Sequence, residues 1–494
     1  MLPHILLPLG AIGLSLAYIA GVVIYRLCLS PLRKFPGPKI AAVTRLPHMW
    51  HTMNGDIVRW IHDLHTKYGD VVRVAPDELS YATGEGWKDI YGHAVLGKKA
   101  THKDLRFYGP GLMADTPDII RADDADHSRF RRNFSHAFSD RALKEQEQLI
   151  RQYVDLLVSK LHDITRKNPQ AKVEMVRMYN FTTFDIMGDL TFGEPLGLLE
   201  GSEYNQWVAK VFASIKANAL LRIIRYFPWL AALSIVFVPR SLRQKREAHI
   251  QYCIERVDRR LAKEKARPDI WGLVLNQTEE KRLSTKEMYA NSQTFMIAGT
   301  ETTATLLSGL TYQLLINPSK LEKLTREVRG AFSADEEITI SGLARLEFLH
   351  ACIEEGLRMY PPVPVGMPRV VPAEGKVICG EMVPGKTAVS VNQWATYRNP
   401  KNFKHPNTFI PERWTNDPEF ATDQKAALQP FSTGPRNCLG KNLAYHEMRL
   451  ILAKVLWHFD LSLCEESVNW TDQKIFTIWE KNPLMVRLTP RRDN

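Results

Sequence analysis

The longest helical pattern in the chain runs from Ser284 to Ile316 and ends at Asn317-Pro318, where the proline stops a helix. Ser284 followed three residues later by Glu287 is a capping box, which marks the start of the helix. At about 1.5 Å per residue this helix is about 50 Å long and can traverse a whole domain. Because it is mostly apolar, we expect the rest of the fold to bury it.

Most of the remaining chain is also helical in pattern, and strand-like runs are short. Helical patterns cover 57–69, 141–164, 204–221, 242–264, 319–332, 343–359 and 440–457, and strand-like runs cover 376–391 and 484–488. Residues 71–83 alternate around Pro76-Asp77, which predicts a small hairpin. We therefore expect a mainly α fold with small β-sheets. No repeat or linker breaks residues 40–494, which favours one domain there despite a length that suggests several.

The N-terminus contains no charged residue from Ile5 to Tyr25, a stretch long enough to cross a bilayer. Only MLPH precedes it, whereas a removed signal peptide, the alternative, would begin with basic residues. The nearest positive charges follow the stretch, so the positive-inside rule places the body in the cytosol. We expect a transmembrane anchor over 1–27 and a proline-rich connector over 28–39.

Charge and cysteine content narrow the classes of function. The net charge of +11 is spread along the chain, which suits an acidic protein partner or an anionic membrane. No nucleic-acid-binding motif accompanies it, so we expect no nucleic-acid partner. The six cysteines form no CxxC pair, which argues against a disulfide framework or a zinc ribbon and suits a reducing compartment.

The stretch FSTGPRNCLG, at 431–440, places Cys438 in a loop poor in helix formers, directly before an apolar helical pattern. A free cysteine at such a junction is most often a buried structural residue. The alternative is a thiolate held still by a stiff loop so that it can ligate a metal. No second Cys or His stands beside Cys438 at zinc-ligand spacing.

Four further stretches carry reactive or charged side chains. AGTETT (298–303) interrupts the long helix with small residues, a carboxylate and hydroxyls. It is either a helix-packing notch, whose hydroxyls bond their own helix, or a functional polar site. The other three stretches supply Glu355 and Arg358 at i, i+3 in EEGLR, Arg413 in PERW, and His127 and Arg131 at i, i+4 in HSRFRR.

Together these stretches resemble the cytochrome P-450 superfamily of haem-thiolate monooxygenases. The loop matches the family pattern F-x-x-G-x-R-x-C-x-G at Phe431, Gly434, Arg436, Cys438 and Gly440. The motifs occur in the family's order, and the resemblance covers the anchor and the whole body. It implies the P-450 fold, a large helical domain with a long central helix and small sheets, behind an N-terminal transmembrane helix.

The resemblance also implies roles for the site residues. Cys438 would be the axial thiolate ligand of the iron of haem b, in a loop that includes Phe431 and Gly440. Glu301 and Thr302 would be an acid–alcohol pair that delivers protons during oxygen activation. His127, Arg131, Arg369 and Arg436 would hold the haem propionates, and Glu355, Arg358 and Arg413 would form a buried structural triad.

No G-x-G-x-x-G motif follows a strand, so the electrons must come from another protein. The resemblance implies an NADPH-dependent diflavin reductase in the same endoplasmic reticulum membrane, and allows a cytochrome b-type donor. Lys441 and Arg449 would fit its acidic face.

Residues 109–120, 217–239, 363–368 and 474–479 would line a pocket for a lipophilic small molecule. The chain resembles filamentous-fungal members that oxidise terpenoids, polyketides or alkaloids, such as the trichothecene hydroxylases. We expect hydroxylation or epoxidation in secondary-metabolite biosynthesis. A haem-thiolate isomerase, dehydratase or desaturase and a non-catalytic haem protein are the alternatives; an isomerase or dehydratase would not need the Glu301–Thr302 pair.

Overall fold

A computed structural model describes residues 2–93, 100–109, 111, 113, 115–203, 206–227, 240–263, 269–275 and 283–491. The chain divides into two compact units, each built from three separate segments. Unit 1 comprises Met1–Asp104, Pro364–Pro406 and Gln424–Arg436, and unit 2 comprises Leu105–Val363, Asn407–Asp423 and Asn437–Asn494. Because neither unit is continuous in sequence, no linker composition marks the boundary between them.

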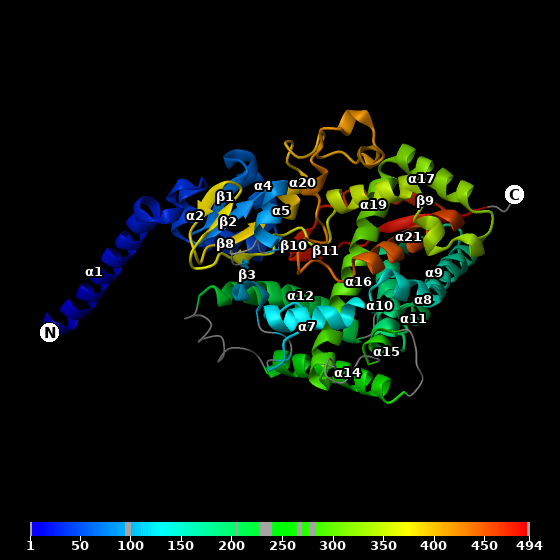
Figure 1. Cartoon of the computed structure of the whole chain (residues 1–494), viewed down its shortest axis with the longest axis horizontal. Helices are drawn as coiled ribbons and strands as arrows, with labels where there is room; N and C mark the ends of the chain where they lie inside the picture. Colours follow the sequence, from blue (N-terminus) through cyan, green and yellow to red (C-terminus); the bar gives the residue numbers. More distant parts are fainter. Residues whose placement is uncertain are drawn as a thin grey trace. The chain divides into compact units, whose positions relative to one another are not determined.

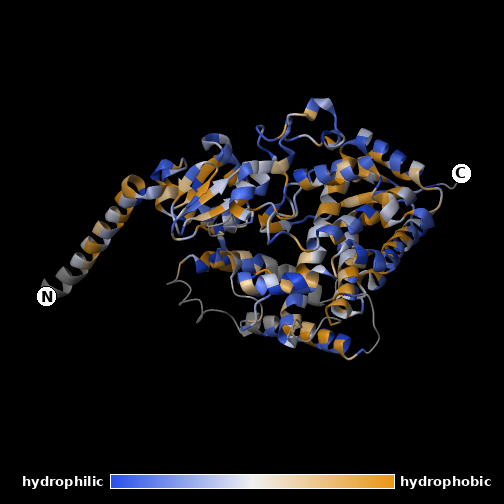
Figure 2. Ribbon diagram, in the orientation of Figure 1, coloured by the Kyte–Doolittle hydropathy of each residue, from blue (hydrophilic) through white to orange (hydrophobic). Residues whose placement is uncertain are grey.

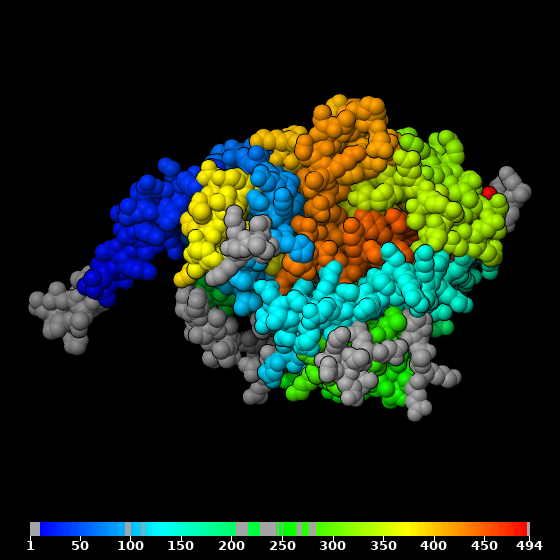
Figure 3. Space-filling view, viewed as in Figure 1, coloured from blue at the N-terminus to red at the C-terminus, as the bar shows by residue number. Residues whose placement is uncertain are grey.

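Unit 1 begins with the helix α1 (Leu2–Ile24), which continues into a π-helical turn, η1 (Tyr25–Leu29). The stretch Gly10–Leu29 is the one helical segment among the described residues that is long and apolar enough to cross a membrane, and none of it is buried. Figure 2 shows apolar residues along most of α1, and Figure 3 shows the helix projecting from the rest of its unit. Membrane anchoring is compatible with this helix.

The rest of unit 1 combines short helices with a five-stranded sheet of order β1-β2-β8-β5-β3. The predicted hairpin is confirmed, because β1 and β2 pair antiparallel from Val71 opposite Tyr81. The elements of unit 1 after η1 are η2 (Pro31–Lys34), α2 (Lys39–Val43), α3 (Leu46–Asn54), α4 (Ile57–Tyr68), β1 (Val71–Ala75), β2 (Glu78–Tyr81), α5 (Gly84–Tyr91), β3 (His102–Lys103), β5 (Arg369–Val370), β6 (Lys376–Ile378), β7 (Glu381–Val383), β8 (Ala388–Val391), α20 (Gln393–Tyr397) and η7 (Lys425–Ala427).

Unit 2 is mainly helical, and the expected long helix is α16 (Thr285–Leu315), capped by Ser284. The predicted capping box is confirmed: Ser284 Oγ accepts from the Glu287 N–H at 3.3 Å, and Glu287 Oε2 accepts from the Ser284 N–H at 2.8 Å. Nearly all of α16 after its first turn is buried. Figure 1 shows α16 running through the body of unit 2, with other helices packed along its length.

The other elements of unit 2 complete the mainly α fold. They are α6 (Leu105–Tyr108), α7 (Asp124–Ser135), α8 (Asp140–Glu145), α9 (Glu147–Lys167), β4 (Lys172–Glu174), α10 (Met175–Phe192), α11 (Leu198–Gly201), α12 (Gln206–Arg225), α14 (Arg240–Leu261), α15 (Ile270–Leu275), α17 (Pro318–Ala331), η4 (Asp335–Glu337), α18 (Ile340–Leu343), α19 (Glu347–Met359), η5 (Pro411–Trp414), η6 (Pro418–Phe420), α21 (Lys441–His458), β9 (Phe459–Leu463), η8 (Glu465–Ser467), β10 (Lys474–Phe476), β11 (Ile478–Glu480) and β12 (Met485–Pro490).

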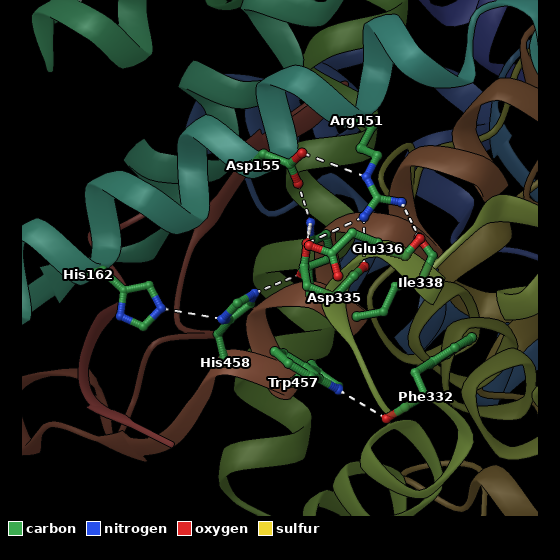
Figure 4. A network of polar contacts seen from close by, with 10 residues as sticks. Arg151, Asp155, His162, Phe332, Asp335, Glu336, Ile338, Trp457 and His458 are labelled. Atoms are coloured by element: carbon green, nitrogen blue, oxygen red, sulfur yellow. Dashed lines mark hydrogen bonds and ion pairs between the residues drawn. The ribbon is translucent and has the colours of Figure 1, made fainter. Parts of the chain in front are cut away.

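An ion-pair network fastens α9, η4 and α21 together inside unit 2 (Figure 4). Lys454, whose side chain is 1% exposed, contacts both Asp155 and Asp335. His458 Nε2 lies 2.8 Å from Asp335 Oδ1, and Arg151 reaches the same carboxylate at 3.3 Å. Burial alone would raise the pKa of Asp335, but hydrogen bonds from His458 and Lys454 hold it far below its usual range.

Candidate functional site

The cysteine loop crosses from unit 1 to unit 2 between Arg436 and Asn437. On the unit 1 side, Gly434 has a φ of +76°, and a Cβ atom there would overlap the carbonyl oxygen of Tyr91. Only glycine meets both demands, which explains why the pattern fixes this residue. Phe431 and Arg436, in the same part of the loop, are both half-buried.

On the unit 2 side, Cys438 lies two residues before the N-cap of α21, which is Gly440. The thiol is free and its surface is open to water. Surrounding protein atoms nevertheless desolvate it enough to raise its pKa, and the Gly440 N–H, Arg131 and Lys441 act in the opposite direction. One backbone N–H and two cationic side chains therefore stabilise negative charge on this sulfur.

Helix α7 holds the cysteine loop in place. Asp123 caps the helix by accepting from the Asp126 N–H at 2.9 Å, and His127 is buried. Arg131 donates from its two Nη atoms to the backbone oxygen and the side-chain oxygen of Asn437, each at 2.6 Å. The structure thus places Arg131, which we expected on a propionate, on the residue next to Cys438.

Arg369 lies in β5 of unit 1, where its side chain is buried. Its guanidinium stands over the Tyr91 ring, with 5.6 Å between Cζ and the ring centroid. Its Nε atom is buried and has no hydrogen-bond partner within the part of the chain that the structure describes. A buried cationic donor of this kind fits an anionic group such as a propionate.

In the middle of α16, the hydroxyls of AGTETT bond back to their own helix. Thr300 Oγ1 donates to the Met296 carbonyl at 2.6 Å, and Thr302 Oγ1 donates to the Ala298 carbonyl at 2.7 Å. Ala298 is exposed and Thr302 is half-buried, so this face of the helix is open. A hydroxyl that donates to a carbonyl can still accept a hydrogen bond, so these contacts leave both interpretations of Thr302 standing.

Gly299 brings α16 close to α10. A Cβ atom on Gly299 would lie 2.8 Å from the sulfur of Met187, closer than real Cβ contacts. Its small size is therefore explained by the packing of the two helices.

Glu301 points to a different side of α16 from Thr302 and is buried. Lys481, between β11 and β12, forms an ion pair with Glu301 Oε1 and donates to Thr305 Oγ1 at 2.7 Å. Burial raises the pKa of Glu301, and Lys481 counters part of that effect. Sequence reasoning gave no sign of Lys481, which is 180 residues from Glu301.

Glu447, on α21, is a further buried carboxyl that the sequence analysis missed. Burial raises its pKa to about 8, and a hydrogen bond with Thr303 of α16 counters this only in part. The carboxyl is thus mostly protonated at neutral pH. An acidic residue within the apolar helical pattern at 440–457 was the available signal.

The predicted triad residues are in contact and have a fourth member. Glu355 accepts from Arg358 Nε at 2.8 Å and Nη2 at 2.7 Å, and from Arg413 Nε at 3.2 Å. Arg413 also pairs with Asp423, which the sequence analysis missed, and Trp414 Nε1 donates to Glu355 at 3.0 Å. Arg358, Arg413 and these hydrogen bonds hold the pKa of Glu355 below its usual value despite complete burial.

The remaining predicted residues are placed as follows. Lys441 is exposed at the start of α21, whereas Arg449 is half-buried, 3.4 Å from His350 Nδ1 and over the Tyr445 ring. In the 474–479 stretch, Trp479 is buried against Tyr360, with 4.1 Å between ring centroids. Residues 110, 112, 114 and 228–239 of the expected pocket lining lie outside the described residues.

Comparison with known proteins gives a consistent result. The family model described as "Cytochrome P450" matches residues 36–486. The chain is 50% identical to "Cytochrome P450 monooxygenase efuB" of Hormonema carpetanum, over 97% of this chain and 95% of that protein. It is 49% identical to "Cytochrome P450 monooxygenase FUM2" of Gibberella moniliformis, over 93% and 98%. It is 43% identical to "Averantin hydroxylase" of Dothistroma septosporum, over 98% and 91%.

Proposed function

The chain belongs to the cytochrome P450 family and is a monooxygenase, and we propose that it hydroxylates or epoxidises a lipophilic secondary metabolite of a fungus. The observation that carries the proposal is the cysteine loop: a free, water-accessible thiol beside a backbone N–H, held in place by Arg131 through Asn437. The match of this chain to fungal monooxygenases over nearly its full length supports the same conclusion.

The residues present fit haem b. Cys438 would ligate the iron, and Gly434 would let the loop pass close to Tyr91. Arg369 would supply a charged donor for a propionate. The family resemblance adds His127, Arg131 and Arg436 as propionate contacts, although both Nη atoms of Arg131 donate to Asn437. With a thiolate ligand, haem supplies the activation of O2. The role of the loop is to keep the sulfur in one position and to stabilise its charge through the Gly440 N–H and Arg131.

Proton handling is assigned to Thr302 and Glu301. Thr302 lies on the open face of α16, and its oxygen can accept a hydrogen bond while its proton is held by Ala298. Glu301 is the nearest carboxyl in sequence, and burial raises its pKa above the ordinary value, so it holds a proton more readily than an exposed carboxylate does. The buried triad of Glu355, Arg358 and Arg413 has a structural role in this proposal.

Electrons would come from NADPH through a diflavin reductase, with a cytochrome b-type protein as a second donor. Lys441 is exposed next to the cysteine loop and can meet an acidic partner surface. Arg449 is partly engaged by His350 and Tyr445, so we assign it a smaller part in docking.

We place the enzyme in the endoplasmic reticulum membrane, with α1 as a single anchor and the body in the cytosol. Of four N-x-S/T sequons, those at Asn133 and Asn180 are buried, and Asn276 lies outside the described residues. Asn469 is exposed and is therefore the informative one. In microsomes we expect no endoglycosidase-sensitive glycan at Asn469 and a body open to added protease. A glycan there would place the body in the lumen.

The activity is tested by incubating the full-length protein, a reductase and NADPH with a lipophilic fungal extract. We expect products heavier by one oxygen atom. The matched pair of variants is Cys438→Ala and Cys464→Ala, because both cysteines are free but Cys464 is buried away from the loop. The first should lose the red-shifted Soret band of the reduced carbon monoxide complex, and the second should keep it. Retention of the band in Cys438→Ala would refute the ligand assignment.

A further inference from the structure

Lys481 and Glu301 form an ion pair that is almost completely withdrawn from water. Each side chain is 4% exposed. Glu301 comes from the middle of α16, and Lys481 comes from the segment that joins β11 and β12. A buried ion pair of this kind adds little net stability compared with apolar residues of similar size. Its presence therefore calls for a role other than stability.

The two oxygens of Glu301 are held differently. Oε1 receives the Lys481 ammonium and lies 3.5 Å from the Thr305 hydroxyl. The same ammonium donates to Thr305, which fixes it between two residues one turn apart on α16. Oε2 is buried and has no hydrogen-bond partner among the described residues. A buried carboxylate oxygen without a partner is costly, so Oε2 is the atom with the strongest tendency to accept a proton or a water molecule.

A second titratable side chain, Tyr360, interacts electrostatically with Glu301. Tyr360 is buried, and its pKa is raised by burial and by the charge of Glu301. Its hydroxyl donates to Gln473 Oε1 at 2.6 Å, and its ring stacks on Trp479. Among the described residues, two charged or titratable groups thus interact with Glu301: the Lys481 ammonium and this neutral phenol.

We propose that Lys481 is a positioning residue that keeps Glu301 ionised and leaves Oε2 as its proton-accepting atom. In this role Oε2 takes a proton from one water molecule and returns it to another, and Lys481 keeps its three protons throughout. The inference rests on the proposed function, since it assigns an orientation to the acid of the proton pathway. It adds a residue from outside α16 to that pathway.

The test is a double-mutant cycle on the full-length, haem-loaded protein, with Lys481→Met, Glu301→Gln and the two combined. Urea unfolding is followed by tryptophan fluorescence at pH 5.5 and pH 8.5. Without Lys481, a buried Glu301 stays protonated in the folded chain while the unfolded chain ionises as the pH rises. We expect Lys481→Met to lower the folded-to-unfolded ratio about tenfold more at pH 8.5 than at pH 5.5. Adding Glu301→Gln should remove this pH dependence.

Lys454→Met is the matched control, because the Lys454 side chain is also buried but is paired with Asp155 and Asp335. The loss in the free energy of unfolding caused by Lys454→Met should be the same with and without Glu301→Gln. Lys481→Arg should restore both stability and the coupling of NADPH consumption to product, whereas Lys481→Met should release hydrogen peroxide. The proposal would be overturned if Lys481→Met lowered the free energy of unfolding equally at both pH values. It would also be overturned if adding Glu301→Gln left that loss unchanged.

The outcomes separate this inference from the proposed function. The unfolding cycle needs no substrate, so it can support the role of Lys481 even if no oxygenated product forms from any extract. Oxygenation by wild type with unchanged coupling in Lys481→Met would instead refute the inference alone.

Discussion

Two buried glutamates in unit 2 are held in opposite ways. Glu355 has two arginines, an indole N–H and the backbone N–H of Ile410 on its oxygens, and its pKa is lowered despite complete burial. Glu301 has one lysine and one weakly placed hydroxyl, its Oε2 has no hydrogen-bond partner among the described residues, and its pKa is raised.

The difference shows how the chemical environment decides what a buried carboxyl can do. Both oxygens of Glu355 accept hydrogen bonds, and two of the donors are arginines, which do not lose their protons in proteins. Glu355 is thus fixed in its ionised state. Glu301 is held by fewer donors, and burial raises its pKa, so it accepts a proton more readily than Glu355 does, which suits a group that exchanges protons.

The largest expected effect is that of Glu355→Gln. It removes the carboxylate that Arg358 and Arg413 share, so we expect a loss of about 3–5 kcal/mol in the free energy of unfolding. Because Glu355 has a lowered pKa, its stabilisation is present above the unfolded-state pKa and is lost as the pH falls through the folded-state pKa. The substitution should therefore cost less under strongly acidic conditions. Urea unfolding at several pH values measures both effects.

The control for Glu355→Gln is Glu322→Gln, since Glu322 pairs with Arg326 on an exposed surface. Such a pair contributes little, so this change should stay within about 0.5 kcal/mol. A similar cost for both variants would contradict the structural role of the buried cluster.

The next prediction concerns Glu447 and the way the free energy of unfolding changes with pH. Its pKa is about 8 in the folded chain against 4.5 for the ordinary group, so the folded state holds its proton more tightly. Stability should be greatest below the lower value and should decline as the pH rises to about 8, by on the order of 4 kcal/mol. Glu447→Gln should flatten that decline, as measured by unfolding from pH 5 to pH 9. An unchanged slope would show that Glu447 is already charged at neutral pH.

Glu301→Gln should lower the free energy of unfolding by about 2 kcal/mol, which is less than the loss expected for Glu355→Gln. Both substitutions nevertheless remove a buried carboxylate. The lysine left without a partner can release its proton and become neutral, which arginine cannot do. The cost should accordingly be smaller at pH 9 than at pH 6, the reverse of the expectation for Lys481→Met. Equal costs for the glutamine variants of Glu301 and Glu355 would remove the contrast between the two sites.

The smallest effect on stability is expected for Thr302→Ala, which removes one hydrogen bond to the Ala298 carbonyl and should cost about 1 kcal/mol. Its effect on coupling should be large, with haem binding and NADPH consumption kept and hydrogen peroxide released in place of product. The quantity to measure is product formed per NADPH at matched haem content. Unchanged coupling would assign Thr302 to helix packing alone, and Thr300→Ala serves as a control with the same backbone contact.

The sequence predicted those features that depend on local patterns. The capping box at Ser284, the β1–β2 hairpin and most helices follow from residue spacing, and the cysteine loop follows from a fixed motif. Helix α10 was missed because every residue except Arg177 is buried, which leaves no amphipathic period to detect.

The missing members of the site are those that depend on contacts between distant segments. Lys481 and Asp423 reach their partners only through the fold, and their surrounding sequence carries no motif. The bond of Arg131 to Asn437 likewise joins residues 306 positions apart. A charge at a given position in the sequence does not reveal which charge it will meet.

The bond between Arg131 and Asn437 has a consequence for how the cysteine loop responds to sequence change. Two hydrogen bonds from α7 hold the residue before Cys438 in its place. The position of the sulfur therefore depends on a helix 306 residues earlier in the chain as well as on the loop itself. A substitution on α7 that removes these bonds can displace the sulfur while every residue of the loop motif stays unchanged.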